Sequence, residues 1–235
     1  DAERDFVVQL YHAEVASVDE RVGFILEVLE HEGRLENTVV IFTSDHGEAF
    51  NEHGHWEHGS TYYDELMRVP MIIAGPGIAP GHEVATPVSI LDLMPTLQEW
   101  LGVRSHDYWH GQSLVDALEG KEPDRGPLYF DGVYNPSERD YRDALLSDNL
   151  KLIAHERPDT VELYDLAADP GETVNLAGSL AADAADLLNE LLEFRLKYAE
   201  EYGRMLPLSE GTSDTSAVSE REKILEKLKS LGYVK

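Results

Sequence analysis

The first 31 residues of the chain have a helical spacing of apolar positions. Between residues 5 and 31 apolar side chains recur every three or four residues, as one face of an amphipathic helix requires. They are Val7, Leu10, Tyr11, Val15, Val18, Val22, Ile25, Leu26 and Leu29. Gly33 follows where a left-handed C-cap is expected. The pattern predicts a helix that ends near Gly33.

Two unbroken apolar runs follow, at residues 38–44 and 69–74. Both are rich in β-branched side chains, and the second ends in Gly75-Pro76-Gly77, so they predict buried strands. A further helix is expected after a cap at Ser89 or Asp92. Its apolar residues Leu97, Trp100 and Leu101 are expected to face a core. Alternation of helix and strand predicts an α/β fold with a mainly parallel sheet and flanking helices.

The pattern changes after about Gly120, where short strand-like runs replace the alternation. The runs are residues 128–130, 141–146, 150–155 and 161–166. With turn residues such as Asp148-Asn149 between them, they predict a small antiparallel sheet, covered by a helix over 180–202. Residues 211–216 have a flexible composition, and 219–231 predict a short charged, peripheral helix. We therefore divide the chain into 1–120, 121–204 and 205–235.

The candidate chemistry lies at the end of the first predicted strand. Asp45 and His46 follow it directly, and His53, His55 and His58 come soon after, so four of the ten histidines fall within thirteen residues. Ligands bind beyond the carboxyl ends of the strands in open α/β sheets. A carboxylate beside an imidazole there suits a divalent cation. A turn residue next to a surface histidine is the alternative for the dipeptide alone.

The wider strings resemble the metal-site segment of the sulfatase family, in the alkaline phosphatase superfamily. They are Ser44-Asp45-His46-Gly47-Glu48, Glu52-His53-Gly54, His58-Gly59-Ser60-Thr61-Tyr62-Tyr63-Asp64-Glu65 and Arg68-Val69-Pro70-Met71-Ile72-Ile73. Later strings, Leu91-Asp92-Leu93-Met94-Pro95-Thr96-Leu97, Glu162-Leu163-Tyr164-Asp165-Leu166 and Asp169-Pro170-Gly171-Glu172, resemble further landmarks. The resemblance covers roughly residues 5 to 195 and only the second half of such an enzyme, with residues 44–65 as the metal-site loop.

The resemblance implies an alkaline-phosphatase-like fold and a role for each site residue. Asp45 and His46 would be ligands of one divalent metal ion, for which Mn²⁺ or Zn²⁺ is favoured over Ca²⁺ or Mg²⁺ by the imidazole ligand. His58 stands where many sulfatases have a lysine, and would bind substrate and act in catalysis. His55 and Trp56 would contact substrate. His53 would either order the loop or add a metal ligand.

The resemblance also implies a nucleophile that this chain does not carry. Family members use a formylglycine made from Cys or Ser in a Cys/Ser-x-Pro-x-Arg string, and these 235 residues hold no Cys and no Ser-x-Pro-x-Arg. Formylglycine is therefore expected upstream, and the N-terminal half of the catalytic domain is an expected partner. The chain alone is expected to be inactive. Uncovered apolar surface would make it poorly soluble or a homo-oligomer.

Composition excludes some functions. The 19 basic and 46 acidic residues give a net charge of −27, which disfavours nucleic-acid or anionic-membrane binding, and no apolar run reaches membrane-spanning length. The sequence leaves the compartment open: periplasmic, extracellular and cytoplasmic locations are all compatible with it. The expected substrate is a small-molecule or saccharide sulfate ester.

Three functions remain open. The first is a sulfatase. The second is another enzyme of the same superfamily, namely a phosphodiesterase, a phosphonate monoester hydrolase or a phospho-transfer enzyme. The third is a non-catalytic half-domain or partner. The upstream nucleophile separates the first two: formylglycine against an unmodified Thr or Ser. Metal binding without turnover would indicate the third.

Overall fold

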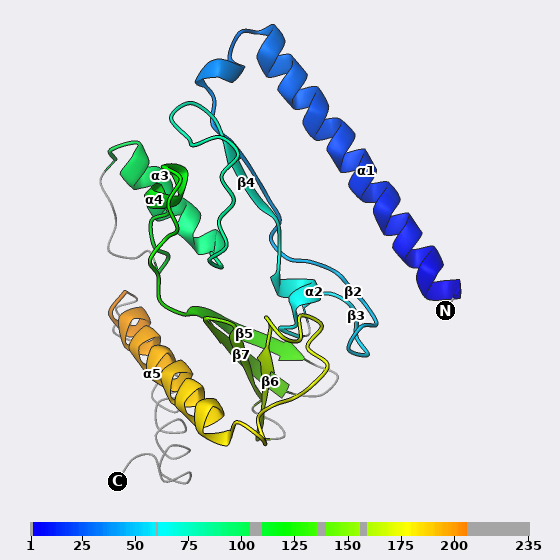
Figure 1. Ribbon diagram of the computed structural model, residues 1–235, viewed down its shortest axis with the longest axis vertical. Coiled ribbons are helices and arrows are strands. Elements are labelled where there is room, and N and C mark those ends of the chain that lie inside the picture. Colours follow the sequence, from blue (N-terminus) through cyan, green and yellow to red (C-terminus); the bar gives the residue numbers. More distant parts are fainter. Residues whose placement is uncertain (1, 60, 104–109, 136–139, 156–158, 206–235) are drawn as a thin grey trace, which may run out of the picture.

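The computed structural model describes residues 2–59, 61–103, 110–135, 140–155 and 159–205. A long helix, α1 (Ala2–His31), extends along one side of the molecule, and an antiparallel sheet with its own helix lies at the opposite end (Figure 1). Between them lie two short two-stranded ribbons and several short helices. Within the described residues, no helix combines the length and hydropathy needed to cross a membrane.

The first helix has the predicted extent and the predicted cap. Gly33 adopts a φ of 63°, its N–H bonds to Glu30 O at 2.9 Å, and the N–H of Arg34 bonds to Leu29 O at 2.8 Å. This pair of bonds is the Schellman arrangement, which satisfies the last carbonyls of a helix. No residue of α1 is buried, however. It contacts residues 35–37 at its C-terminal end and residues 49–50 nearer its N-terminus, where Tyr11 meets Phe50 edge-on with ring centroids 5.0 Å apart.

The two predicted strands pair with each other. The 3₁₀ helix η1 (Leu35–Asn37) leads into β1 (Val40–Thr43), and β4 (Met71–Ala74) lies beside β1 in antiparallel register, with Ile41 opposite Ile73. All strand pairs among the described residues are antiparallel, so the mainly parallel sheet predicted from the sequence is not confirmed. The prediction that the two strands are buried is wrong, because no residue of β1 or β4 is buried and Ile72 is 60% exposed. An apolar run also does not determine the direction of the neighbouring strand.

The middle of the chain contains short elements. They are β2 (Ala49–Phe50), β3 (Trp56–Glu57), α2 (Asp64–Met67), η2 (Ile90–Asp92), α3 (Leu93–Trp100) and α4 (Val115–Leu118). The cap predicted at Ser89 or Asp92 uses both residues, because Ser89 and Asp92 form a reciprocal capping box at η2. Leu101 is 65% exposed, so its predicted place in a core is wrong. The helix already ends at Trp100, which turns Leu101 towards solvent.

The C-terminal sheet is the antiparallel meander expected from the sequence. It contains β5 (Leu128–Asn135), β6 (Asp140–Ser147), β7 (Leu150–His155) and β8 (Thr160–Asp165), in that order. Asp148, with a φ of 51°, lies in the two-residue turn that joins β6 to β7. The predicted boundary near residue 120 falls between α4 and β5.

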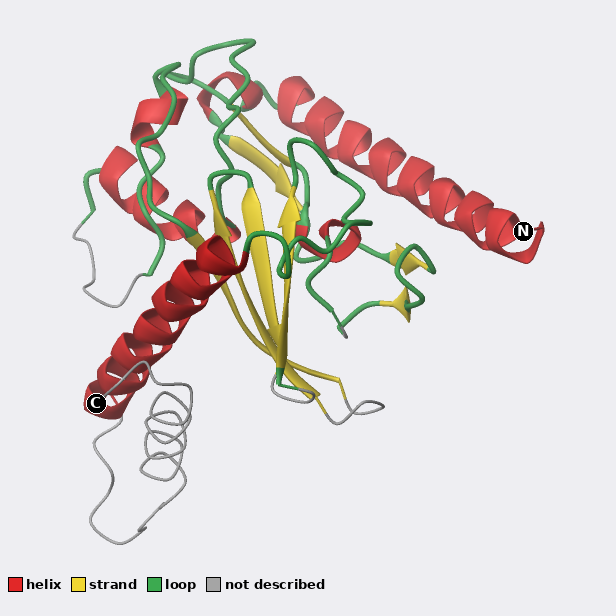
Figure 2. Cartoon of the chain, turned by 60° about the horizontal axis from the view of Figure 1, so that its bottom comes forward, coloured by secondary structure: helices red, strands yellow, loops and turns green. Residues whose placement is uncertain are grey.

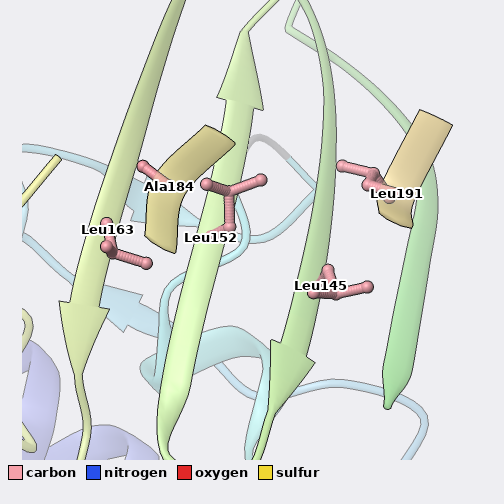
Figure 3. Packing of buried hydrophobic residues seen from close by; sticks show 5 residues of the cluster. All are labelled: Leu145, Leu152, Leu163, Ala184 and Leu191. Atoms are coloured by element: carbon pink, nitrogen blue, oxygen red, sulfur yellow. The ribbon is translucent and has the colours of Figure 1, made fainter. Parts of the chain in front are cut away.

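Helix α5 (Ala181–Met205) covers one face of this sheet (Figure 2). Leu145, Leu152 and Leu163 lie in one cross-strand row, and each is fully buried against Ala184 and Leu191 of α5 (Figure 3). Burial of a leucine side chain contributes about 1.5–3 kcal/mol, so this row is the main core of the described chain. The helix predicted over 219–231 and the flexible stretch 211–216 lie outside the described residues.

Candidate metal and sulfate-ester site

Asp45 stands just beyond the carboxyl end of β1, and its side chain is 85% exposed. The turn is held locally: Ser44 Oγ donates to His46 O at 2.8 Å, and the His46 N–H donates to Asp45 Oδ1 at 3.0 Å. The pKa of Asp45 is lowered, first by its own backbone N–H and then by the neighbouring His46. The carboxylate is therefore held ionised and open to solvent, as a cation ligand must be.

Gly47 closes the segment that carries the site. Its N–H donates to Leu66 O at 2.8 Å, and a Cβ at this position would lie 2.0 Å from Glu65 O. Only glycine allows the two backbones to approach this closely. The bond between Gly47 and Leu66 therefore closes a loop at its base. Within this loop, β2 and β3 pair as a small hairpin. We call residues 44–67 the site loop.

The structure brings His46 and His58 together. Their rings stack with centroids 4.2 Å apart and planes 24° from parallel, although twelve positions separate them. His46 Nδ1 lies 2.7 Å from Gly47 O, which favours a proton on Nδ1 and leaves Nε2 as the ligand nitrogen. His58 Nδ1 lies 3.2 Å from Glu48 Oε2. Glu48 therefore orients His58, a role that the sequence did not predict for Glu48.

Asp45 and His46 fit part of a metal centre. His46 Nε2 lies 3.8 Å from Asp45 Oδ2, and together they offer a carboxylate oxygen and a neutral imidazole nitrogen. Within the described part of the chain, no group of three or more His, Asp and Glu side chains is arranged to hold a metal ion. The donor set thus suits two ligands of one ion, and the described residues contribute no third.

His53 is turned away from this pair. Its Nδ1 lies 2.7 Å from Glu65 Oε1, its Nε2 lies 3.1 Å from the carbonyl oxygens of both Gly171 and Glu172, and its ring stacks on Tyr63 at 3.8 Å. Burial lowers the pKa of His53, but the bond and charge of Glu65 outweigh it and raise the pKa overall. Both ring nitrogens are engaged, which favours the loop-ordering role over an additional metal ligand.

His55 is the last residue of the hairpin turn, and Trp56 is the first residue of β3. The His55 side chain is half-buried, and burial first and the charge of Arg142 second lower its pKa. Trp56 is 45% exposed and pairs across the hairpin with Phe50. Their contact with substrate stays a prediction.

The loop is joined to the C-terminal sheet by buried charges that the sequence did not reveal. Lys151 Nζ lies 2.8 Å from Asp64 Oδ1 and 2.8 Å from Glu172 Oε1, and Lys151 and Glu172 are almost fully buried. Asp64 pairs with Lys151, and Glu65 pairs with His53. A lysine in an apolar strand, and a glutamate after Asp169-Pro170-Gly171, were the only signals available.

The chain is similar to known proteins along most of its length. Residues 3–103 match the family profile described as Sulfatase. The chain is 32% identical to arylsulfatase K of Xenopus laevis over 191 residues, which is 77% of this chain and 35% of that protein. It is 35% identical to choline-sulfatase of Rhizobium meliloti (strain 1021) over 172 residues, which is 71% of this chain and 32% of that protein. The chain thus spans about a third of the length of these curated relatives.

Solved structures give the same result. One, described as bound to its substrate D-glucosamine-2-N,6-O-disulfate, is similar with a TM-score of 0.71 at 33% identity, over 79% of this chain and 40% of that one. A phosphonate monoester hydrolase from Silicibacter pomeroyi is similar with a TM-score of 0.65 at 29% identity, over 77% of this chain and 39% of that one. From the profile, the relatives and the fold together, the chain belongs to the sulfatase family.

Proposed function

We propose that the complete protein containing this chain is a metal-dependent hydrolase of sulfate esters. Asp45 and His46 hold the metal, and His58 binds the ester. The observation that carries the proposal is the stacked pair of His46 and His58 beside the exposed carboxylate of Asp45. In this proposal the pair supplies a cation ligand and a hydrogen-bond donor side by side after the end of β1, within the residues that match the Sulfatase profile.

The bound cation, Mn²⁺, Zn²⁺, Ca²⁺ or Mg²⁺, would supply Lewis-acid stabilisation of negative charge on the ester oxygens. His58 acts beside it: Glu48 holds its Nδ1, and among the described residues no hydrogen-bond partner faces its Nε2. In the doubly protonated form of His58, Nε2–H donates to an anionic ester oxygen or to the departing alkoxide while Nδ1–H stays bonded to Glu48. His55 and Trp56 contact the rest of the substrate.

The nucleophile comes from outside these 235 residues, as a formylglycine, because the chain holds no Cys and no Ser-x-Pro-x-Arg. The segment that carries it also covers the apolar face of α1, on which Leu10, Val15 and Ile25 are at least 51% exposed. By this proposal, residues 1–235 alone bind metal weakly, hydrolyse nothing, and tend to self-associate or precipitate.

A phosphonate or phosphate ester hydrolase is the second candidate. It is favoured by the Asp-His pair, whose imidazole suits a transition metal, and by the similarity to the phosphonate monoester hydrolase. A non-catalytic partner is the third, because the described residues offer no third metal ligand.

The test is turnover of 4-nitrophenyl sulfate, 4-nitrophenyl phosphate and a phenylphosphonate ester by the complete protein, with a peptide mass map of its nucleophile. We expect sulfate turnover and a formylglycine. His58→Ala should lower kcat about 100-fold, while the exposed His31→Ala control should leave it unchanged. Phosphoryl turnover from an unmodified Thr or Ser would establish the second candidate, and metal binding without turnover the third.

A further inference from the structure

A buried lysine lies between the site loop and the C-terminal sheet. Lys151 belongs to β7, where its neighbour Leu152 faces the core under α5. Alternation along the strand therefore turns Lys151 to the opposite face, together with Ile153, which packs against Tyr62 of the site loop. The Lys151 side chain is 1% exposed. A charge at such depth requires partners.

Its two partners come from different segments. Asp64 is the first residue of α2, in the site loop, and Glu172 lies in the turn that follows β8, with a φ of 49°. Glu172 also bonds directly to the loop, since its Oε2 accepts from the Asp64 N–H at 2.6 Å. Burial raises the pKa of Glu172, and the charge of Lys151 opposes this rise.

A second connection runs beside the first. His53 links Glu65 of α2 to the carbonyl oxygens of Gly171 and Glu172. We call Lys151, Asp64, Glu172, His53 and Glu65 the clamp. It holds the first turn of α2 through two side chains and one backbone N–H.

A short series of contacts connects the clamp to His46, one of the proposed metal ligands. Helix α2 contains Leu66, whose carbonyl accepts the Gly47 N–H at 2.8 Å, and Gly47 packs against the Glu65 carbonyl. Gly47 is the neighbour of His46. A shift of α2 therefore moves the backbone next to the ligand, and with it the stack of His46 on His58.

We propose that Lys151 and Glu172 are positioning residues, through which the C-terminal sheet fixes the place of the metal-ligand loop. The enzymatic part of this inference rests on the proposed sulfatase function. Apolar side chains could fill the same space with little loss of stability, since buried ion pairs are often no more stabilising than well-packed apolar residues. What the ion pairs add is one defined position for α2, because each charge must meet its partner.

The test uses Lys151→Met in the complete protein, with Arg195→Met as the matched control. Arg195 NH1 pairs with Asp143 Oδ2 at 2.8 Å between α5 and β6, in the same sheet but away from the site loop. We expect the backbone amides of Gly47 and Asp64 to exchange hydrogen at least 10-fold faster in Lys151→Met and at the wild-type rate in Arg195→Met. We also expect a kcat at least 10-fold lower for 4-nitrophenyl sulfate in Lys151→Met, with KM little changed and partial rescue by Lys151→Arg.

If Lys151→Met does not fold, Glu172→Gln gives the same readout. It keeps an oxygen that can accept from the Asp64 N–H and removes the charge facing Lys151. Wild-type exchange at Gly47 and Asp64 in a folded variant would overturn the inference, as would equal acceleration in Arg195→Met. If the variant exchanges faster but the wild-type protein hydrolyses no sulfate ester, the positioning role of the clamp stands and the proposed function is rejected.

Discussion

The two ends of this molecule both carry apolar residues at regular spacing, but only one end buries them. In the C-terminal sheet Leu145, Leu152 and Leu163 are fully buried under α5. In the N-terminal part α1 carries apolar residues every three or four positions, yet it buries none of them. An apolar face becomes a core only where a complementary element packs on it. Asp45 and His46, the proposed metal ligands, belong to the less packed region, and the clamp connects their loop to the better packed one.

The largest expected effect on stability is in the C-terminal core. Leu152→Ala removes a fully buried side chain that lies between Leu145 and Leu163 in the cross-strand row. We expect it to lower the free energy of unfolding by about 2–5 kcal/mol, because the cavity is enclosed by neighbouring strands and α5. Urea denaturation of the 235-residue chain measures this. A loss below about 1 kcal/mol would show that the sheet is not the stable part.

The variant Gly47→Ala should disturb the site loop without disturbing the C-terminal core. The new Cβ would lie 2.0 Å from Glu65 O, so the site loop must open. We expect kcat/KM of the complete protein for a sulfate ester to fall about 100-fold, as a displacement of about 1 Å can cause. The thermal midpoint of the C-terminal sheet should change little. Full activity in this variant would remove the link between loop closure and catalysis.

The face of the sheet that meets the site loop should respond to acid. Glu162 accepts bonds from Tyr63 and Tyr164, each at 2.7 Å, and lies 2.9 Å from His155 Nε2. Burial raises the pKa of Glu162, but the bonds from His155, Tyr164 and Tyr63 outweigh it and lower the pKa to about 2. Its folded pKa lies below the ordinary value of 4.5, so its stabilisation is complete above that pH and is lost as the pH falls towards 2.

The loss between those pH values should be on the order of 2 kcal/mol, and Glu162→Gln should flatten this part of the stability curve. Urea denaturation at several pH values between 2 and 6 measures it. Parallel acid profiles for wild type and variant would show that Glu162 is not responsible.

The smallest effect is expected on α1. Leu10 is 53% exposed, so Leu10→Ala in the 235-residue chain should change the free energy of unfolding by less than about 0.5 kcal/mol. In the complete protein the same change should cost about 1–3 kcal/mol if another segment covers this face. Equal small effects in both would contradict the proposal that α1 is covered.

Local features of the fold could be predicted from the sequence. The Schellman cap at Gly33, the turn at Asp148 and the β6–β8 strands follow from residue type and spacing over a few positions. The antiparallel pairing of β1 with β4 could not, because an apolar run fits either direction, and neither could the partial exposure of both strands. The sequence of an amphipathic helix likewise does not determine which element packs on its apolar face.

In the site, residues that follow from local sequence could be predicted, whereas contacts between distant segments could not. Asp45 and His46 follow a recognisable strand, and the structure places His58 on His46. Lys151 could not be assigned, because it contacts Asp64 from 87 positions away and its sequence context is that of an ordinary strand. The role of His53 depends in the same way on carbonyl groups more than a hundred positions distant.

The most direct test of the central claim is to measure bound metal and sulfate-ester turnover together, in the complete wild-type protein and in Asp45→Ala. The account predicts about one divalent ion per wild-type chain, and loss of both the ion and at least about 1,000-fold of the rate in the variant. An Asp45→Ala protein that keeps its metal and its rate would remove Asp45 from the site and contradict the account.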